Sequence, residues 1–278
     1  MTRFIENLVE IAGDYDAIVL DQWGVLHDGK TPYPGAVECL TDLHRRGTRL
    51  AVLSNSGKRA DLNAARIASK GFPEAWFEVV MTSGEALHRD IAAGIIPERR
   101  FYPIEGAPGD AADWAGDLQG VLACSLEIAD AVLLMGLPDG DTHSVAQSCL
   151  DAARARDLPV YCSNPDRKSP RGGGYVTSPG ALAHTYAEAG GTVRFYGKPH
   201  LPVYQALSTA LGTTNLLMVG DSLEHDISGA DAAGWDSLFV RGGIHAPDFA
   251  QGDLAETLTR LVGAENAPAP THSIKVLQ

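Results

Sequence analysis

The sequence is acidic and moderately apolar, with 278 residues, a formal net charge of −13 and 45% hydrophobic residues. A chain of this length forms one large or two modest domains, each with a core of its own. The negative charge opposes binding to a phosphate backbone, so we expect no nucleic-acid partner. No apolar run approaches the roughly 20 residues that cross a bilayer. The N-terminus also lacks the apolar core of a secretion signal, so we expect a cytoplasmic protein that does not bind a membrane.

Four cysteines are scattered along the chain, at Cys39, Cys124, Cys149 and Cys162. None of them forms a C-x-x-C pair, which argues against a zinc site and against a framework of disulfides. We therefore expect free thiols.

Short β-branched runs alternate with helical patterns near both ends of the chain. The runs predict buried strands at residues 18–20, 50–53, 78–81, 193–196, 216–219 and 237–240. The helical patterns lie near residues 35–46, 58–70, 84–93, 201–211 and 224–233. This alternation predicts an α/β fold, a doubly wound parallel sheet of the Rossmann-like kind.

The middle of the chain has strands and helices of its own. Strands are predicted at residues 131–135, 159–162 and 175–177, with helices near 142–156 and 180–189. We therefore expect a core domain made of residues 1–84 and 190–278, interrupted by an inserted α/β domain of residues 85–189. The stretch after Gly263, rich in proline and alanine, is expected to be an irregular tail.

Chemically capable side chains follow four of the predicted strands. These positions are Asp21, Ser54-Asn55-Ser56, Gly197-Lys198-Pro199 and Gly220-Asp221-Ser222. In open α/β sheets, ligands bind beyond the carboxyl ends of the strands, so these groups are expected to converge. With Asp226, the two strand-end aspartates would form an acidic pocket that requires a cation, and oxygen ligands suit Mg²⁺.

The same edge offers groups that can bind a phosphate. Ser54, Asn55 and the amides at the start of the following helix can donate to phosphate oxygens. Lys198 can neutralise the phosphate charge and hold Asp21 ionised. Taken singly, an aspartate after a strand is often only a helix cap, and a lysine is usually on the surface. Four such positions together favour an active site.

Four segments of the sequence resemble the four motifs of the haloacid dehalogenase-like hydrolase superfamily. They are Asp21-Gln22-Trp23-Gly24-Val25-Leu26, Ser54-Asn55-Ser56, Gly197-Lys198-Pro199 and Gly220-Asp221-Ser222-Leu223-Glu224-His225-Asp226-Ile227. The long insert between the second and third motifs, with Ser163-Asn164-Pro165-Asp166 inside it, is similar to the class IIA cap of the sugar-phosphate, p-nitrophenyl phosphate and pyridoxal phosphate phosphatases.

The resemblance implies a role for each motif. Asp21 would attack phosphorus and form an aspartyl-phosphate, which replaces one difficult displacement with two easier ones. Mg²⁺ would be held by the Asp21 carboxylate, the Trp23 backbone carbonyl and Asp221, with Asp226 in support through water. The remaining motif residues, Ser54, Asn55, Ser56 and Lys198, would bind the transferring phosphoryl group.

The resemblance also implies that the cap excludes water and sets specificity. Asn164 and Asp166 are the candidate substrate contacts in it, although an Asn-Pro-Asp segment is equally well explained by turn chemistry. Homodimerisation through the cap occurs in related proteins, and no feature of this sequence tests it.

Trp23 departs from the phosphatase pattern, which has a second aspartate at this position. That aspartate protonates the leaving oxygen and later accepts a proton from water, and an indole does neither. General acid–base catalysis is typically worth about 10² to 10⁴-fold. Either His27 or Asp28 stands in as the acid, or the substrate is an acyl or aryl phosphate that needs no protonation, or the bond broken is not P–O.

These observations predict a Mg²⁺-dependent phosphatase of small phosphorylated metabolites, with Asp21, Lys198 and His27 as its catalytic residues. Turnover would be slow or restricted in substrate because of Trp23. The alternative is a protein that binds or senses a phosphate ligand and has only vestigial catalysis. Retention of Asp21 argues against this alternative, because a carboxylate beside an anion does not help to bind it.

Overall fold

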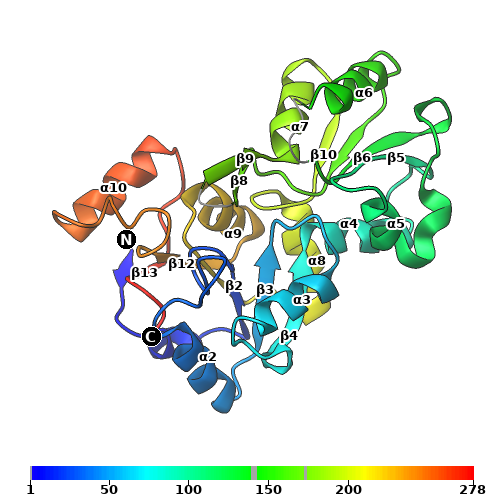
Figure 1. The fold of residues 1–278 in the computed structure, drawn as a ribbon. Helices are drawn as coiled ribbons and strands as arrows, with labels where there is room; N and C mark the ends of the chain where they lie inside the picture. Colours follow the sequence, from blue (N-terminus) through cyan, green and yellow to red (C-terminus); the bar gives the residue numbers. More distant parts are fainter. Residues whose placement is uncertain (1, 139–142, 172–173) are drawn as a thin grey trace. The chain divides into compact units, whose positions relative to one another are not determined.

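The computed structural model describes residues 2–138, 143–171 and 174–278. Contacts within the chain divide it into two compact units, which Figure 1 shows as ribbons. The first unit comprises Met1–Ser54, Asp61–Met81 and Lys198–Gln278, and the second comprises Asn55–Ala60 and Thr82–Gly197. By their contacts, residues 82–84 and 190–197 thus belong to the second unit, and residues 55–60 join it.

The first unit is built on a seven-stranded sheet. Its strands run in the order β1 (Arg3–Phe4), β13 (His272–Ile274), β12 (Asp236–Val240), β11 (Leu216–Gly220), β2 (Ala17–Leu20), β3 (Leu50–Ser54) and β4 (Phe77–Thr82). Strand β2 pairs in parallel with β11 on one side and with β3 on the other. All residues of these three strands are buried, which explains why they read as continuous apolar runs.

Helices follow the strands of this sheet. They are α1 (Val9–Ala12), α2 (Ala36–Arg45), α3 (Ala60–Ala68), α8 (Leu201–Leu211), α9 (Ser228–Ala233) and α10 (Leu254–Ala264), with short helical turns at Glu74–Trp76 and Leu223–Ile227. Helix α2 shows the pattern that places them, because Cys39, Leu40 and Leu43 lie on one buried face and join the main core of the sheet. The predicted fold class, a Rossmann-like α/β fold with a parallel sheet, is confirmed.

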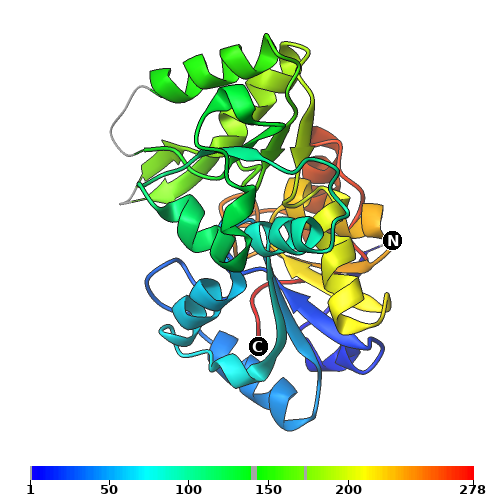
Figure 2. The ribbon, with the colours of Figure 1, turned by 90° about the vertical axis from the view of Figure 1, so that its right-hand side faces the viewer.

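The second unit has its own parallel sheet, in the order β10 (Val193–Phe195), β7 (Val160–Cys162), β6 (Ala131–Leu134) and β5 (Phe101–Ile104). A hairpin of β8 (Lys168–Arg171) and β9 (Gly174–Thr177) comes between β7 and β10 in the sequence. The helices of this unit are α4 (Ser83–Ala92), α5 (Asp110–Ala115), α6 (Ser144–Arg154) and α7 (Pro179–Glu188), with 3₁₀ turns at Gly116–Val121 and Leu126–Ile128. Helices α6 and α7 pack on each other and on the sheet, as the green ribbons in Figure 2 show.

The prediction of an irregular tail at the end of the chain was wrong. Instead of an irregular tail, residues His272–Ile274 form β13, which pairs in parallel with β1 and β12 inside the sheet. A strand of three residues that includes a histidine and a serine is too short and too polar to give a periodic signal. The first residue of the helix expected at 142–156 lies outside the described residues, and the helix seen there begins at Ser144.

Among the described helices, none combines the length and the apolar character that a membrane span requires.

Candidate active site

Three neighbouring strands of the large sheet end at the same edge with polar side chains. Asp21 follows β2, Asp221 follows β11, and Ser54 is the last residue of β3. Because the strands are parallel, their carboxyl ends lie together, which is where ligands bind in open α/β sheets. The convergence that the sequence predicted for Asp21 and Asp221 is therefore present in the first unit.

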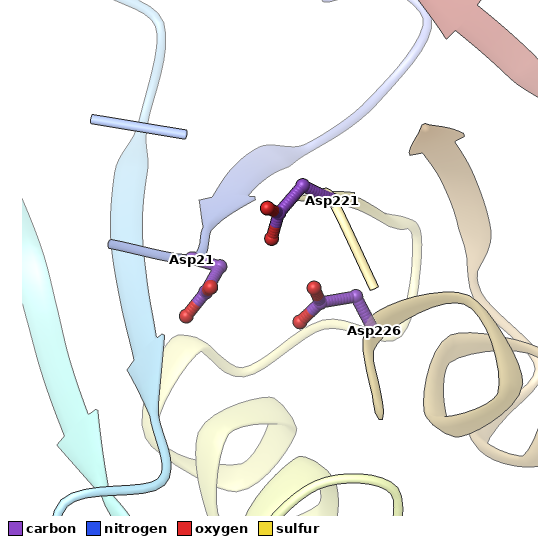
Figure 3. A group of neighbouring side chains, drawn as sticks. All are labelled: Asp21, Asp221 and Asp226. Atoms are coloured by element: carbon purple, nitrogen blue, oxygen red, sulfur yellow. The ribbon is translucent and has the colours of Figure 1, made fainter. Parts of the chain in front are cut away.

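Asp21, Asp221 and Asp226 form a compact carboxylate cluster. Each can offer one oxygen such that the three atoms lie within 4.8 Å of one another, and Figure 3 shows the three side chains turned toward a common point. Asp221 is 3% exposed, and Asp226, in the helical turn after β11, is fully buried. Acidic groups at this separation, with Asp221 and Asp226 buried and Asp21 partly buried, repel one another unless a cation lies between or beside them.

Lys198 supplies one positive charge to the cluster. Its Nζ donates to Asp21 Oδ1 at 2.7 Å and to Asp226 Oδ1 at 2.6 Å, and its side chain is 4% exposed. Burial opposes the charged ammonium, but the carboxylates of Asp21 and Asp226 outweigh this effect and raise the pKa of Lys198 above its usual range. The lysine is thus a fixed cation in the site and does not release a proton near neutral pH.

One ammonium does not balance three carboxylates. Burial raises the pKa of Asp21 to about 6, against the lowering effect of Lys198. Burial and the charges of Asp21 and Asp226 raise the pKa of Asp221 well above its ordinary value. A divalent cation fits this donor set, because hard carboxylate oxygens at this spacing suit Mg²⁺ or Ca²⁺ and the charge deficit favours binding.

Glycines allow the backbone to approach Asp221 closely. A Cβ at Gly24, whose φ is +80°, would lie 1.7 Å from Asp221 Oδ2, and one at Gly243 would lie 2.1 Å from the same oxygen. The amide of Ile244 donates to that oxygen at 2.7 Å. This support for Asp221 was not predicted from the sequence, although the pair Gly242-Gly243, two residues beyond the end of a strand, is a signal of close backbone approach.

Trp23 projects from the loop after Asp21 and is 39% exposed. Its six-membered ring covers Gly29, where a Cβ would lie 2.0 Å from the Cη2 atom of the indole. The carbonyl of Gly29 accepts a hydrogen bond from Lys70 Nζ at 2.7 Å, and the ring of His27 meets the indole edge to face at 5.6 Å. The indole is therefore held in place by contacts with its own loop.

Neither of the two candidate acids, His27 and Asp28, is placed as a proton donor. His27 is fully buried, its Nδ1 accepts from the Gly29 amide at 3.0 Å, and its Nε2 has no partner among the described residues. Burial, followed by the charges of Lys70 and Arg66, lowers the pKa of His27 to about 4. Asp28 accepts from the amides of Thr31 and Lys30, which holds the pKa of its carboxyl below the usual range.

The Ser54-Asn55-Ser56 segment follows β3. Ser54 is 7% exposed, and the Oγ atom of Ser56 accepts from the Lys58 amide at 3.3 Å. The amide of Ala60, which begins helix α3, donates to the carboxylate of Glu85 at 3.4 Å. The expectation that the amides at this helix start are available to phosphate thus does not hold for Ala60.

The structure brings together two of the predicted site residues in the second unit. Asn55 Nδ2 donates to Asp166 Oδ1 at 2.6 Å. The amide of Asp166 in turn donates to Asn164 Oδ1 at 3.1 Å, so the side chain of Asn164 closes the turn that its sequence suggested. Asp166 is thus connected to the second motif, and Asn164 has a structural role.

Two models of known protein families match segments of this chain that contain the motifs. Residues 18–110 match the model of the haloacid dehalogenase-like hydrolases. Residues 195–263 match a second model, described as HAD-hydrolase-like. The first match includes Asp21 and Ser54, and the second includes Lys198, Asp221 and Asp226.

Individual known proteins are also similar to this chain. A haloacid dehalogenase-like hydrolase from Brucella suis 1330 has 30% sequence identity and a TM-score of 0.78, with 99% of this chain and 100% of that chain covered. D-glycerol 3-phosphate phosphatase from Mycobacterium tuberculosis is 31% identical over 238 residues, 85% of this chain and 65% of the relative. A structure of glycerol phosphate phosphatase from the same species, in complex with calcium, has a TM-score of 0.71 at 25% identity and covers 87% of this chain and 71% of that one.

The chain belongs to the haloacid dehalogenase-like hydrolase family, as its motifs predicted. The chain also shares its fold with a p-nitrophenyl phosphatase from Archaeoglobus fulgidus, with a TM-score of 0.73 at 21% identity over 95% of this chain and 96% of that one.

Replacement of Asp221 by asparagine should stabilise the cation-free protein. The pKa of Asp221 is higher in the folded than in the unfolded chain, so its ionisation costs folding free energy as the pH rises. We expect Asp221→Asn to raise the free energy of unfolding by ~1 kcal/mol at pH 7.5 in EDTA, a gain typical of relieved strain in an active site. The gain should shrink at pH 4.5, because the raised pKa of Asp221 means that its folded form takes up a proton more readily than the unfolded chain as the pH falls.

Urea unfolding at both pH values measures this difference. The matched control is Asp231→Asn, which removes an exposed carboxylate from α9 of the same unit. A loss of stability in Asp221→Asn at pH 7.5, or an equal gain in Asp231→Asn, would contradict the electrostatic account of the cluster.

Proposed function

We propose that this protein is a Mg²⁺-dependent phosphatase of small phosphorylated metabolites that acts through an aspartyl-phosphate on Asp21. The observation that carries the proposal is the buried ion-pair cluster at the strand ends. It couples Asp21 to Lys198 at 2.7 Å and places Asp221 and Asp226 within reach of a common cation. A nucleophilic carboxylate, a fixed ammonium and a set of oxygen ligands are the parts that phosphoryl transfer to aspartate requires.

The names of the relatives support the substrate class. The Mycobacterium tuberculosis relative acts on D-glycerol 3-phosphate, and relatives from rat are named glycerol-3-phosphate phosphatase and chronophin. This chain spans 65% of the length of the mycobacterial relative. We therefore assign a small phosphate monoester as the substrate, without assigning glycerol phosphate itself.

Mg²⁺ would be held by the carboxylates of Asp21 and Asp221 and by the backbone carbonyl of Trp23, with Asp226 in support. Once bound, it would offset the negative charge that the site and the phosphate share. The residues of this chain fit that role, because the cluster is short of positive charge and its oxygens already point to a common centre.

Asp21 performs the bond-forming step. One of its oxygens attacks phosphorus, the bond from phosphorus to the leaving oxygen breaks, and the electron pair stays on that oxygen. A water molecule then attacks the phosphoryl group, the bond from phosphorus to the Asp21 oxygen breaks so that Asp21 departs as the carboxylate, and the proton of the water passes to solvent. Lys198, Ser54, Asn55 and Ser56 bind the phosphoryl oxygens, and Lys198 also keeps Asp21 ionised and oriented.

Trp23 limits both steps, because no aspartate is present to give a proton to the leaving oxygen and to accept one from water. His27 does not replace it, since both of its nitrogens are buried and its imidazole is neutral near pH 7. We therefore propose slow or restricted turnover of alkyl phosphates. The loss corresponds to about 10² to 10⁴-fold in rate.

The two-part organisation supports a division of labour. The first unit carries the reacting groups, and we assign the second unit as the cap domain that supplies specificity. Asp166 is the candidate substrate contact within it, and its carboxylate accepts a hydrogen bond from Asn55 of the same unit.

Trp23 also favours one other function, a protein that binds or senses a phosphorylated ligand without turning it over. This alternative leaves the cost of the cluster unexplained, because a buried carboxylate next to a bound anion weakens binding. Catalysis through Asp21 would explain why the chain keeps this electrostatically unfavourable carboxylate.

Binding of Mg²⁺ should stabilise the folded protein through Asp221. A ligand at 100 times its dissociation constant adds roughly 2.7 kcal/mol to the free energy of unfolding. Differential scanning calorimetry of metal-stripped protein should therefore show a higher unfolding midpoint after addition of MgCl₂. The shift should fall below pH 6, where Asp21 is protonated and the ligands lose charge.

The variant Asp221→Asn should lose most of this shift, and Asp231→Asn should keep it. An unchanged shift in Asp221→Asn would place the cation somewhere other than the carboxylate cluster.

A panel of substrates tests the activity. With Mg²⁺ present, we expect the wild type to hydrolyse p-nitrophenyl phosphate and acetyl phosphate, and Asp21→Asn to hydrolyse neither. Trp23→Asp should extend turnover to sugar phosphates and glycerol phosphate, with a gain of about 10²-fold or more in kcat because the proton shuttle is restored. Release of inorganic phosphate measures all of these rates. No turnover by the wild type or by Trp23→Asp, with phosphate compounds still bound, would leave the binding protein as the function.

A further inference from the structure

The Trp23 indole occupies an unusual position for a large apolar side chain. It lies two residues beyond Asp21, and the backbone next to it borders the buried carboxylates, since Gly24 is in contact with Asp221. Nevertheless 39% of the residue is exposed to solvent. An exposed aromatic surface two residues from the nucleophile is available for contact with a ligand.

The loop under the indole fixes its orientation. The six-membered ring lies over Gly29, where any side chain would collide with it. Lys70, which lies just beyond the end of α3, donates from its Nζ to the carbonyl of Gly29. The carboxylate of Asp28 closes the turn by accepting from the amides of Lys30 and Thr31. An aromatic ring that is already held in place loses little conformational entropy when a ligand stacks on it.

The geometry around the indole also determines which leaving groups can depart. His27 presents no nitrogen to solvent, and the Asp28 carboxylate accepts hydrogen bonds within its own turn. When the bond from phosphorus to the leaving oxygen breaks, the electron pair therefore remains on that oxygen, and solvent supplies the proton afterwards. A conjugated leaving group accommodates this charge by delocalisation, and a saturated alcohol does not.

We infer that Trp23 is a specificity-determining platform, which selects phosphate monoesters whose leaving oxygen is attached to a flat, conjugated ring. The ring would stack on the exposed indole while Asp21 receives the phosphoryl group, so one residue both removes the proton shuttle and recognises substrates that do not need it. This inference rests on the proposed phosphatase activity and names the substrate class of that site.

A pair of aryl phosphates isolates the stacking contribution. Phenol and 2-naphthol have similar acidity, so phenyl phosphate and 2-naphthyl phosphate differ mainly in the area of the ring. Aromatic pairs contribute about 0.5 to 1.5 kcal/mol beyond simple burial, so the wild type should prefer 2-naphthyl phosphate by about threefold or more in kcat/KM. The preference should disappear in Trp23→Leu and persist in part in Trp23→Phe.

Two glycine variants provide a matched test of the position of the indole. Gly29→Ala adds a methyl group 2.0 Å from the ring and should reduce the naphthyl preference by displacing it. Gly47→Ala imposes the same kind of backbone strain, at φ +77°, with nothing within 4 Å of the new atom, and should keep the preference. Thermal unfolding of each variant shows whether it is folded at the assay temperature.

A binding measurement separates recognition from chemistry. Titration calorimetry of Asp21→Asn should show tighter binding of 2-naphthyl phosphate than of phenyl phosphate, and the double variant Asp21→Asn, Trp23→Leu should bind both equally. The same preference in the wild type and in Trp23→Leu, or equal binding of both compounds by Asp21→Asn, would overturn the platform.

Failure of the proposed function gives a different result. If no phosphate monoester and no acetyl phosphate is hydrolysed in a manner that depends on Asp21, the phosphatase assignment itself is wrong. If turnover depends on Asp21 but the naphthyl-to-phenyl ratio does not depend on Trp23, only the role of the indole is wrong.

Discussion

The mutual repulsion of three clustered carboxylates, two of them buried, is the constraint on which the site depends. Asp21, Asp221 and Asp226 are brought together by adjacent strand ends and a helical turn, and Lys198 offsets only part of their charge. The folded chain therefore maintains an arrangement that is electrostatically unfavourable by itself. Such an arrangement is typical of a site prepared for a cation and for transient charge on phosphorus.

The surrounding structure is organised to hold these groups in place. The strands that carry Asp21 and Asp221 are fully buried and pair directly with each other. Backbone without side chains, at Gly24 and Gly243, closes against Asp221. The core of the first unit thus provides the rigidity that preorganised electrostatics require, and this is a property of the fold as much as of the motif residues.

The sequence predicted the parts of this arrangement that have a local signal. Continuous apolar runs marked the central strands, and acidic residues after them marked the cluster. Two features had no such signal. Strand β13 is three residues long and depends on pairing with β1 and β12, and the contact between Ile244 and Asp221 joins residues 23 positions apart. Both arise from tertiary packing, which local propensity does not encode.

Trp23 shows how a single departure from a family pattern gains meaning from structure. The sequence offered His27 and Asp28 as substitute acids and favoured His27, which titrates near neutral pH. In the structure, His27 is buried and Asp28 accepts hydrogen bonds within its own turn. Both side chains can titrate, but neither is available to a substrate. What remains beside the nucleophile is an exposed indole, and this changes the question from which acid replaces aspartate to which substrate needs none.

The most direct test of the central claim is to trap the phosphoryl group on Asp21. Protein incubated with Mg²⁺ and acetyl phosphate, quenched in acid and digested, should yield a phosphorylated peptide that contains Asp21, and hydroxylamine should remove the label. The label should be absent from Asp21→Asn. A wild type that hydrolyses acetyl phosphate without any label on Asp21, or that is labelled equally in the Asp21→Asn variant, would contradict nucleophilic catalysis by this carboxylate.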